Sequence, residues 1–323
     1  LLRRQVATEL DAASDAFGTP RRTLLMNGSP VAPRGRAAAP ADLQIADAPC
    51  RVYLSATGRM VRAELVPDAP NGGIVAPARR SKHDAIRTAV DSTARGDLGA
   101  VTTLGRLVRF TPVDLPSVPA NSVQLGAGTK ADQYLGLDVN EHVVTIVPLT
   151  GSAPIALGTA QGIVKRVAAS ELPPGKHDVE IIALKAGDRV VGAALAPDDS
   201  ELVFVASDAQ LLRFDAAAVR PQGRAAGGMA GIRLGDGARA IAFSAVRATD
   251  ETIVATVAGS SAALPGTDAG SAKVSAFAEF PAKGRATGGV RAQRFLRGED
   301  ALVLAWVGDE ARAVGADGAV RQL

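Results

Sequence analysis

Short apolar runs separated by polar turns recur along the chain and predict strands joined in tight hairpins. The clearest case lies within residues 201–234, where the apolar runs 202–206 and 211–214 flank a short polar turn. Two β-leaning runs around such a turn are typical of a β-hairpin. The loop that follows, residues 222–231, is rich in glycine. Glycine disfavours a helix there and allows backbone N–H groups to come close to an anion such as phosphate.

The same hairpin pattern occurs six times. Its copies lie at residues 52–62, 100–110, 155–167, 201–214, 252–274 and 311–323, and the fifth copy has an insertion rich in Ser, Ala and Gly in its turn. The turn markers lie 47 to 61 residues apart and are Gly58, Gly105, Gly162, Ala209, Gly270 and Gly318. Six units of about 50 residues predict an all-β, propeller-like array.

A helix is predicted before the first hairpin. Within residues 1–17, the apolar side chains of Leu2, Val6, Leu10 and Ala13 follow helical spacing, and the glycine and proline at positions 18 and 20 end the helix. Residues 28–40 are rich in Pro, Gly and Ala, which is typical of a linker.

Composition and charge restrict the possible classes of protein. The single cysteine, Cys50, cannot form an internal disulfide, so a reducing cytoplasm is expected. The sequence contains no signal peptide and no run of 18 apolar residues, and no membrane contact is expected. Because the sequence begins without Met and in mid-pattern, we expect a fragment of a longer protein. Residues 1–36 account for the whole net charge of +3, so bulk charge does not indicate nucleic acid.

Several motifs resemble a known family. Residues 9–10 (EL) and 17–23 (FGTPRRT) are similar to the end of the coiled-coil arm in the A subunits of bacterial type IIA topoisomerases. Residues 227–237 (GGMAGIRLGDG) and 279–290 (EFPAKGRATGGV) resemble two patterns of the C-terminal domain of those proteins. The resemblance extends over the whole chain. It implies the end of the coiled-coil arm at residues 1–25, a linker at 26–40 and a six-bladed β-pinwheel at 41–323.

The resemblance leaves two kinds of topoisomerase open. In gyrases the first blade carries the gyrase A box, Q-[RK]-R-G-G-[RK]-G, and nothing between Leu65 and Lys82 matches it. The nearest similar segments, residues 222–228 and 283–289, lie in other blades. In the family the box accompanies tight wrapping of DNA. Its absence favours the topoisomerase IV type and weak wrapping, with a diverged gyrase as the alternative.

Basic residues recur near the hairpin turns, and the resemblance implies duplex DNA as their ligand. In a strand, residues three apart point to opposite faces, so a pair such as Arg59 and Arg62 grips one surface only if the strand twists or ends between them. The repetition of one basic position in several blades predicts a basic rim that bends DNA through phosphate contacts. The predicted DNA-binding residues are Arg59, Arg62, Arg79, Arg80, Lys82, Arg106, Arg109, Lys165, Arg166, Lys176, Arg213, Arg224, Lys283, Arg285 and Arg321.

The sequence lacks the motifs of an enzyme active site. Its three histidines, at positions 83, 142 and 177, lie far apart without a cluster of Cys or carboxylates at ligand spacing, and no Walker-type motif occurs. In the family, the cleaving tyrosine lies upstream and ATP binds the other protein of the enzyme. We therefore expect no catalytic residue, cofactor or metal in this fragment, with ATP and Mg²⁺ acting only elsewhere in the parent enzyme. Tyr53 and Tyr134 are expected to be core or strand residues.

The function implied is binding and bending of duplex DNA for ATP-dependent strand passage by a type IIA topoisomerase. The implied partners are DNA, the other domains of the same topoisomerase chain and the ATPase B chain, with the fragment monomeric and located in the cytoplasm at the nucleoid. One alternative is a β-propeller platform that binds protein, with the basic residues serving as solvated strand ends that prevent edge pairing. A propeller-type enzyme would need convergent carboxylates, whereas the acidic residues lie mostly in predicted turns.

Overall fold

The chain forms two units, residues 1–45 and 46–323. The computed structural model describes residues 2–18, 46–75, 85–263, 270–309, 312–314 and 318–322. The first unit contains α1 (Leu2–Phe17), which confirms the predicted helix and buries none of its residues. The second unit contains the short helix α2 (Ala131–Leu135). Neither helix of the described residues has the length and hydropathy that spanning a membrane requires.

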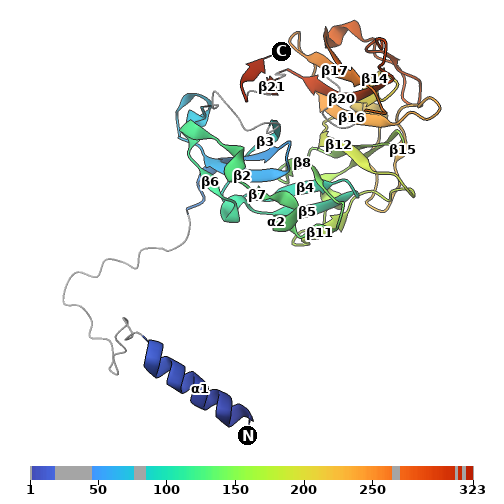
Figure 1. Cartoon of the computed structure of the whole chain (residues 1–323). Helices are drawn as coiled ribbons and strands as arrows, with labels where there is room; N and C mark the ends of the chain where they lie inside the picture. The colour runs from blue at the N-terminus through green and yellow to red at the C-terminus, as the bar shows by residue number, and fades with distance from the viewer. Residues whose placement is uncertain are drawn as a thin grey trace. The chain divides into compact units, whose positions relative to one another are not determined.

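The second unit is an array of small, mainly antiparallel sheets, or blades, built on one plan (Figure 1). Each blade has a hairpin at its centre, formed by β1–β2 (Pro49–Ser55, Arg59–Glu64), β4–β5 (Leu98–Thr102, Arg106–Phe110), β9–β10 (Ile155–Thr159, Ile163–Val167), β13–β14 (Glu201–Ala206, Gln210–Asp215) and β17–β18 (Ile253–Gly259, Ser271–Ala276). In each blade a strand from later in the chain pairs with the first strand of the hairpin, on the inner side near the centre of the array. These inner strands are β3 (Ile86–Thr93), β8 (Val143–Pro148), β12 (Val190–Leu195), β16 (Ala240–Val246) and β20 (Ala301–Gly308).

The outer strands lock neighbouring blades together. Each comes from the chain after it has passed through the hairpin of the next blade, so that the third hairpin, for example, precedes the outer strand of the second blade. A 3₁₀ turn begins this return, and we call the return path the crossing segment. The outer strands are β6 (Ser117–Val118) and β7 (Thr129–Lys130) on the first blade, and β11 (Asp178–Glu180), β15 (Met229–Ala230) and β19 (Val290–Arg291) on the next three.

All six predicted turn markers are confirmed. Each has a positive φ, between 58° and 78°, including the alanine Ala209. At Gly162 the crossing segment also requires the absence of a side chain, because a Cβ atom there would lie 2.7 Å from the carbonyl oxygen of Ile232. The glycine therefore permits both the turn and the close approach of the outer strand.

The predicted number of blades is wrong, since the described residues form five. The sixth hairpin forms β21 (Arg312–Val314) and β22 (Val320–Gln322), which pair only with each other among the described residues. The segment before the sixth hairpin supplies β20, so Trp306 belongs to the fifth blade. Counting turns overestimates the blades because each blade takes its inner and outer strands from later in the chain.

The hydrophobic core lies between successive blades, where the inner strands of neighbouring blades contact one another. Between the fourth and fifth blades, for instance, Val203 and Val205 pack in one cluster with Val254 and Leu302. Small and β-branched side chains dominate these layers, as the composition predicts. Cys50 is fully buried in the first cluster, and burial raises the pKa of its thiol to about 11.

Candidate nucleic-acid interface

Four of the predicted DNA-binding arginines occupy equivalent positions in successive hairpins, four residues after the turn marker. These are Arg62, Arg109, Arg166 and Arg213, and their side chains are only 1% to 17% exposed. Each reaches the crossing segment that returns from the next blade. Arg62 donates to the carbonyl of Leu115 at 3.4 Å and Arg109 to that of Pro173 at 3.3 Å. The guanidinium of Arg213 lies over the ring of Phe277, 4.5 Å from its centroid.

Arg166 shows this internal role most fully. One of its terminal nitrogens donates to the carbonyls of Ala216 and Val219 at 2.9 and 3.1 Å. The other donates to the carbonyl of Ala196 at 2.8 Å and to Asp198 at 2.6 Å. The side chain is 1% exposed, so the structure places it in the interior and not on the predicted basic rim. Its hydrogen bonds hold the 3₁₀ turn η6 (Ala216–Ala218) against the hairpin of the preceding blade.

Lys165 is also an interior residue. It has no exposed surface, and its ammonium donates to the carbonyls of Arg224 and Ala226, each at 2.7 Å. Burial lowers the pKa of this ammonium to about 8. The structure thus places Lys165 in the interior, as it does Arg166, and not on the predicted basic rim. Both residues fix a crossing segment from inside.

The two basic residues nearest the first turns are engaged as well. Arg59 donates to the carbonyl of Gly128 at 2.6 Å, at the start of the outer strand. Arg106 pairs with Glu141 and Asp178, and the hydrogen bond to Glu141 raises the pKa of its guanidinium. Burial acts to raise the pKa of the Glu141 carboxyl, but hydrogen bonds from Arg106 and Thr102 outweigh it and hold that pKa below its usual value. The surrounding carboxylates neutralise the charge of Arg106.

Four other predicted residues lie on the outer loops of the blades. Lys176 and Lys283 are exposed, whereas Arg224 and Arg285 are half-buried. Their contact with DNA stays a prediction. Three more, Arg79, Arg80 and Lys82, lie outside the described residues, as does the side chain of Arg321 in β22.

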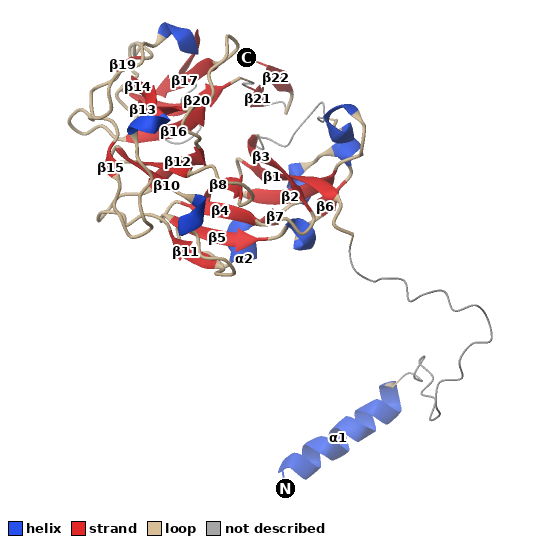
Figure 2. Cartoon of the chain, turned by 180° about the vertical axis from the view of Figure 1, so that it is seen from behind, coloured by secondary structure: helices blue, strands red, loops and turns tan. Residues whose placement is uncertain are grey.

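A surface that the turn-based prediction only partly included is the most basic part of the array. We define the basic perimeter as residues 220–234 and 281–298, which together contain no Asp or Glu. It carries eight basic residues: Arg220, Arg224, Arg233, Lys283, Arg285, Arg291, Arg294 and Arg297. The two segments include the outer strands β15 and β19, at the periphery of the third and fourth blades (Figure 2). Charge is therefore concentrated at one edge of a nearly neutral array.

The two segments of the basic perimeter form one continuous surface. The backbone N–H of Ala286 donates to the carbonyl of Gly231 at 2.7 Å, and that of Arg233 to the carbonyl of Thr287 at 3.0 Å. The side chain of Arg285 reaches across to the carbonyl of Ala230 at 2.6 Å. The glycine-rich loop thus uses backbone groups to join adjacent blades.

The charges of the basic perimeter are available to a ligand. Six of the eight side chains are exposed, and none forms a salt bridge with a carboxylate of the described residues. Five of them were missed by the search for basic residues near hairpin turns: Arg220, Arg233, Arg291, Arg294 and Arg297. The signal that identifies them is the absence of acidic residues over two long segments. Among the described residues, no group of three metal-ligating side chains occurs.

Interlocked β-blades with a basic outer edge define a propeller-like domain with a positive potential at that edge. A family model described as "DNA gyrase C-terminal domain, beta-propeller" matches residues 154–197, 200–247 and 266–305. The chain is thus similar to the C-terminal domains found in the A subunits of type IIA DNA topoisomerases.

Individual relatives agree with this family. The gyrase A protein of Mycobacterium tuberculosis (strain H37Rv) is 30% identical over 216 residues, which cover 64% of this chain and 25% of that protein. The gyrase A protein of Escherichia coli (strain K12) is 26% identical over 220 residues, 66% of this chain and 23% of that protein. The chain thus spans about a quarter of the length of these relatives.

Two solved structures share the fold. The C-terminal domain of DNA topoisomerase IV aligns with a TM-score of 0.66 at 18% identity, covering 87% of this chain and 84% of that one. A DNA gyrase A C-terminal domain aligns with a TM-score of 0.57 at 16% identity, covering 85% and 88%.

The buried arginine predicts a large effect on stability. Arg166→Ala should lower the free energy of unfolding by about 3 kcal/mol or more, because three buried carbonyls lose their donor. The matched control is Arg247→Ala, which removes an arginine paired with the adjacent Asp199, both side chains being about two-thirds exposed. That change should cost less than about 1 kcal/mol. Urea unfolding of both variants measures the difference. Equal stabilities of the two variants would contradict the role of Arg166 in holding η6 against the preceding blade.

The lowered pKa of Lys165 predicts that the stability of the folded chain depends on pH. The folded chain releases the Lys165 proton at about pH 8, whereas an unfolded lysine holds its proton to about 10.4. Between these values the unfolded state binds more protons, so the stability contributed by this site rises with pH. Relative to Lys165→Met, the wild-type chain should gain up to about 3 kcal/mol between pH 8 and pH 10.5. Urea titrations at several pH values measure this gain, and a constant difference between the two chains would show that burial does not shift the lysine.

Proposed function

We propose that this domain binds duplex DNA along the basic perimeter and bends it, presenting a DNA segment for strand passage by a type IIA topoisomerase. One observation carries the proposal. Eight basic residues without a single carboxylate form a continuous surface on a domain whose other residues carry a net negative charge. Such a surface suits a regular array of phosphates, which attract cations whatever the base sequence.

The shape of the perimeter supports bending. Its two segments lie on adjacent blades whose outer edges face different directions around the array (Figure 2). A duplex that keeps phosphate contacts with both segments has to curve with them. Phe295 is the only aromatic residue of the perimeter and is half-buried, so stacking of single-stranded bases is disfavoured.

The remaining parts of the proposal concern the parent enzyme. The apolar side chains of Leu2, Val6 and Leu10 on α1 are 47% to 77% exposed, which suits a helix that pairs within a coiled-coil arm. Strand cleavage would then belong to other domains of the same topoisomerase chain, and ATP hydrolysis to its B chain. The domain itself would act without a cofactor.

Neutralising the perimeter should weaken DNA binding. We expect the triple variant Arg220→Gln, Arg233→Gln, Lys283→Gln to bind a duplex of about 40 base pairs at least tenfold more weakly near 0.1 M salt, and equally so for unrelated sequences. The slope of log affinity against log salt should become shallower by about two to three, because each lost phosphate contact removes about 0.9 from it. Fluorescence anisotropy across a salt series measures both quantities.

The matched control changes the same charge elsewhere. Arg95→Gln, Arg189→Gln, Arg239→Gln removes three exposed cations outside the perimeter and should leave both affinity and slope nearly unchanged. Equal effects of the two triple variants would refute the perimeter as the binding surface. No DNA binding by the wild-type chain even at low salt would instead favour the protein-binding platform.

The missing gyrase A box bears on the type of enzyme. We propose the topoisomerase IV type, in which the domain bends DNA without wrapping it tightly. Sealing a nicked plasmid by ligase in the presence of the chain should then change its linking number only slightly, as resolved on agarose gels. A strong positive change in linking number that grows with protein concentration would contradict this proposal and favour a diverged gyrase.

A further inference from the structure

Among the described residues no outer strand pairs with the fifth blade, whereas each of the other four blades has one. In those blades the carbonyl of the turn residue accepts a hydrogen bond from the residue that follows the outer strand, as Ala209 does from Ala292 at 2.8 Å. At the other end, the carbonyl of Arg213 accepts from Lys283 at 3.0 Å. In the fifth blade, β18 pairs only with β17 among the described residues. Val274, equivalent to Arg213, is 44% exposed.

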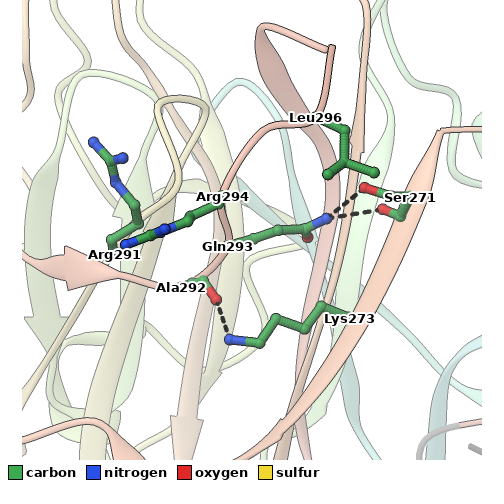
Figure 3. A pocket seen from close by; sticks show the side chains of 7 residues that line it. All are labelled: Ser271, Lys273, Arg291, Ala292, Gln293, Arg294 and Leu296. Atoms are coloured by element: carbon green, nitrogen blue, oxygen red, sulfur yellow. Dashed lines mark hydrogen bonds between the residues drawn. The ribbon is translucent and has the colours of Figure 1, made fainter. Parts of the chain in front are cut away.

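A pocket of about 710 Å³ lies beside this edge (Figure 3). Gln293, which is 6% exposed, forms part of its wall and donates to the carbonyl and hydroxyl oxygens of Ser271 at 3.0 and 2.9 Å. Its side-chain oxygen accepts from Thr256 at 2.7 Å. Lys273 donates to the carbonyl of Ala292 at 2.9 Å. These hydrogen bonds hold the wall in place, so the pocket is formed before any ligand binds.

The neighbouring blade shows what fills the equivalent position. Residues 291–294 continue from β19 just as residues 230–233 continue from β15. Against the latter lies the crossing loop, with Ala286 bonded to Gly231 and Thr287 to Arg233. In the fifth blade no described segment occupies the equivalent position beside residues 291–294. We call this position the open seat, and its counterpart beside residues 230–233 the filled seat. By analogy, the seat is shaped for a loop that leads into a short outer strand.

The charge of the pocket defines the chemistry of its occupant. Lys273, Arg291 and Arg294 line it and no carboxylate does. The corresponding residues of the filled seat are Leu212, Ala230 and Arg233, so the open seat carries two more cations. Figure 3 shows the side chains of Arg291 and Arg294 extending toward the same side of the pocket. An occupant with carboxylates would complement them.

We propose that the outer edge of β18 and this pocket form a docking groove for an extended, carboxylate-bearing peptide segment of a partner protein. The segment adds as the outer strand of the fifth blade, with main-chain hydrogen bonds to Ala272 and Val274, the equivalents of Leu211 and Arg213. Its carboxylates meet Arg291 and Arg294. A strand edge offers alternating N–H and C=O groups at the spacing of a polypeptide, which favours a peptide over a nucleic acid.

The experiment uses a fluorescein-labelled peptide with the sequence of residues 177–182 (HDVEII), the acidic outer strand of the second blade. We expect saturable binding to the full chain by anisotropy, weakened at least tenfold by Arg291→Gln with Arg294→Gln. Arg297→Gln, which changes an exposed cation that does not line the pocket, serves as the matched control and should bind as the wild type does. A peptide with Asn and Gln in place of its Asp and Glu should bind weakly.

The backbone contribution is tested separately. Val274→Pro removes an N–H group from the strand edge and should abolish peptide binding while circular dichroism and thermal unfolding report an intact fold. An N-methylated form of the acidic peptide should fail to bind the wild-type chain. Undiminished binding of that form would overturn the proposal, as would wild-type affinity of the double arginine variant. If that variant loses duplex DNA binding and the peptide binds neither chain, the groove is a DNA contact and the proposal fails.

Discussion

The fold depends on bringing a crossing segment from each blade back to the blade before it. That return carries backbone carbonyls into places that water does not reach, and an unsatisfied buried carbonyl is costly. A cation near the end of each of the first three hairpins meets this need: Arg62 and Arg109 donate to one carbonyl each, and Arg166 donates to two carbonyls of its crossing segment. Arg213 replaces the carbonyl bond by a contact with Phe277. The recurrence of arginine at this position therefore follows from how the blades interlock.

The sequence was informative where a residue's role is set locally. A turn with positive φ requires Gly, or occasionally Ala as at position 209, and all six markers were placed correctly. The blade count was not accessible in the same way, because strands that complete a blade lie up to about 80 residues from its hairpin and are as short as two residues. Two-residue strands such as β15 carry no periodicity that could reveal them.

For the candidate site, too, local sequence does not reveal the contacts that decide where a charged side chain points. A cation next to a turn looks identical in sequence whether it points to solvent, as at Lys176, or into the interior, as at Lys165. Which direction the side chain takes depends on whether it finds hydrogen-bond partners on a segment from another blade. What the sequence does contain is the charge balance of whole segments: a stretch that excludes carboxylates keeps a positive potential regardless of the direction of each side chain. For a surface that binds phosphates, that balance is a better guide than the spacing of pairs.

The proposed DNA surface and the proposed peptide groove share two residues, Arg291 and Arg294. An acidic peptide seated on β18 would neutralise a quarter of the eight cations of the basic perimeter. The two ligands would then oppose each other, and by linkage each would lower the affinity of the other by the same factor. Because phosphate contacts weaken with salt while main-chain bonds of an added strand do so much less, the balance would move toward the peptide as ionic strength rises. The open edge of the fifth blade would thus place a means of releasing DNA within the surface proposed to bind it.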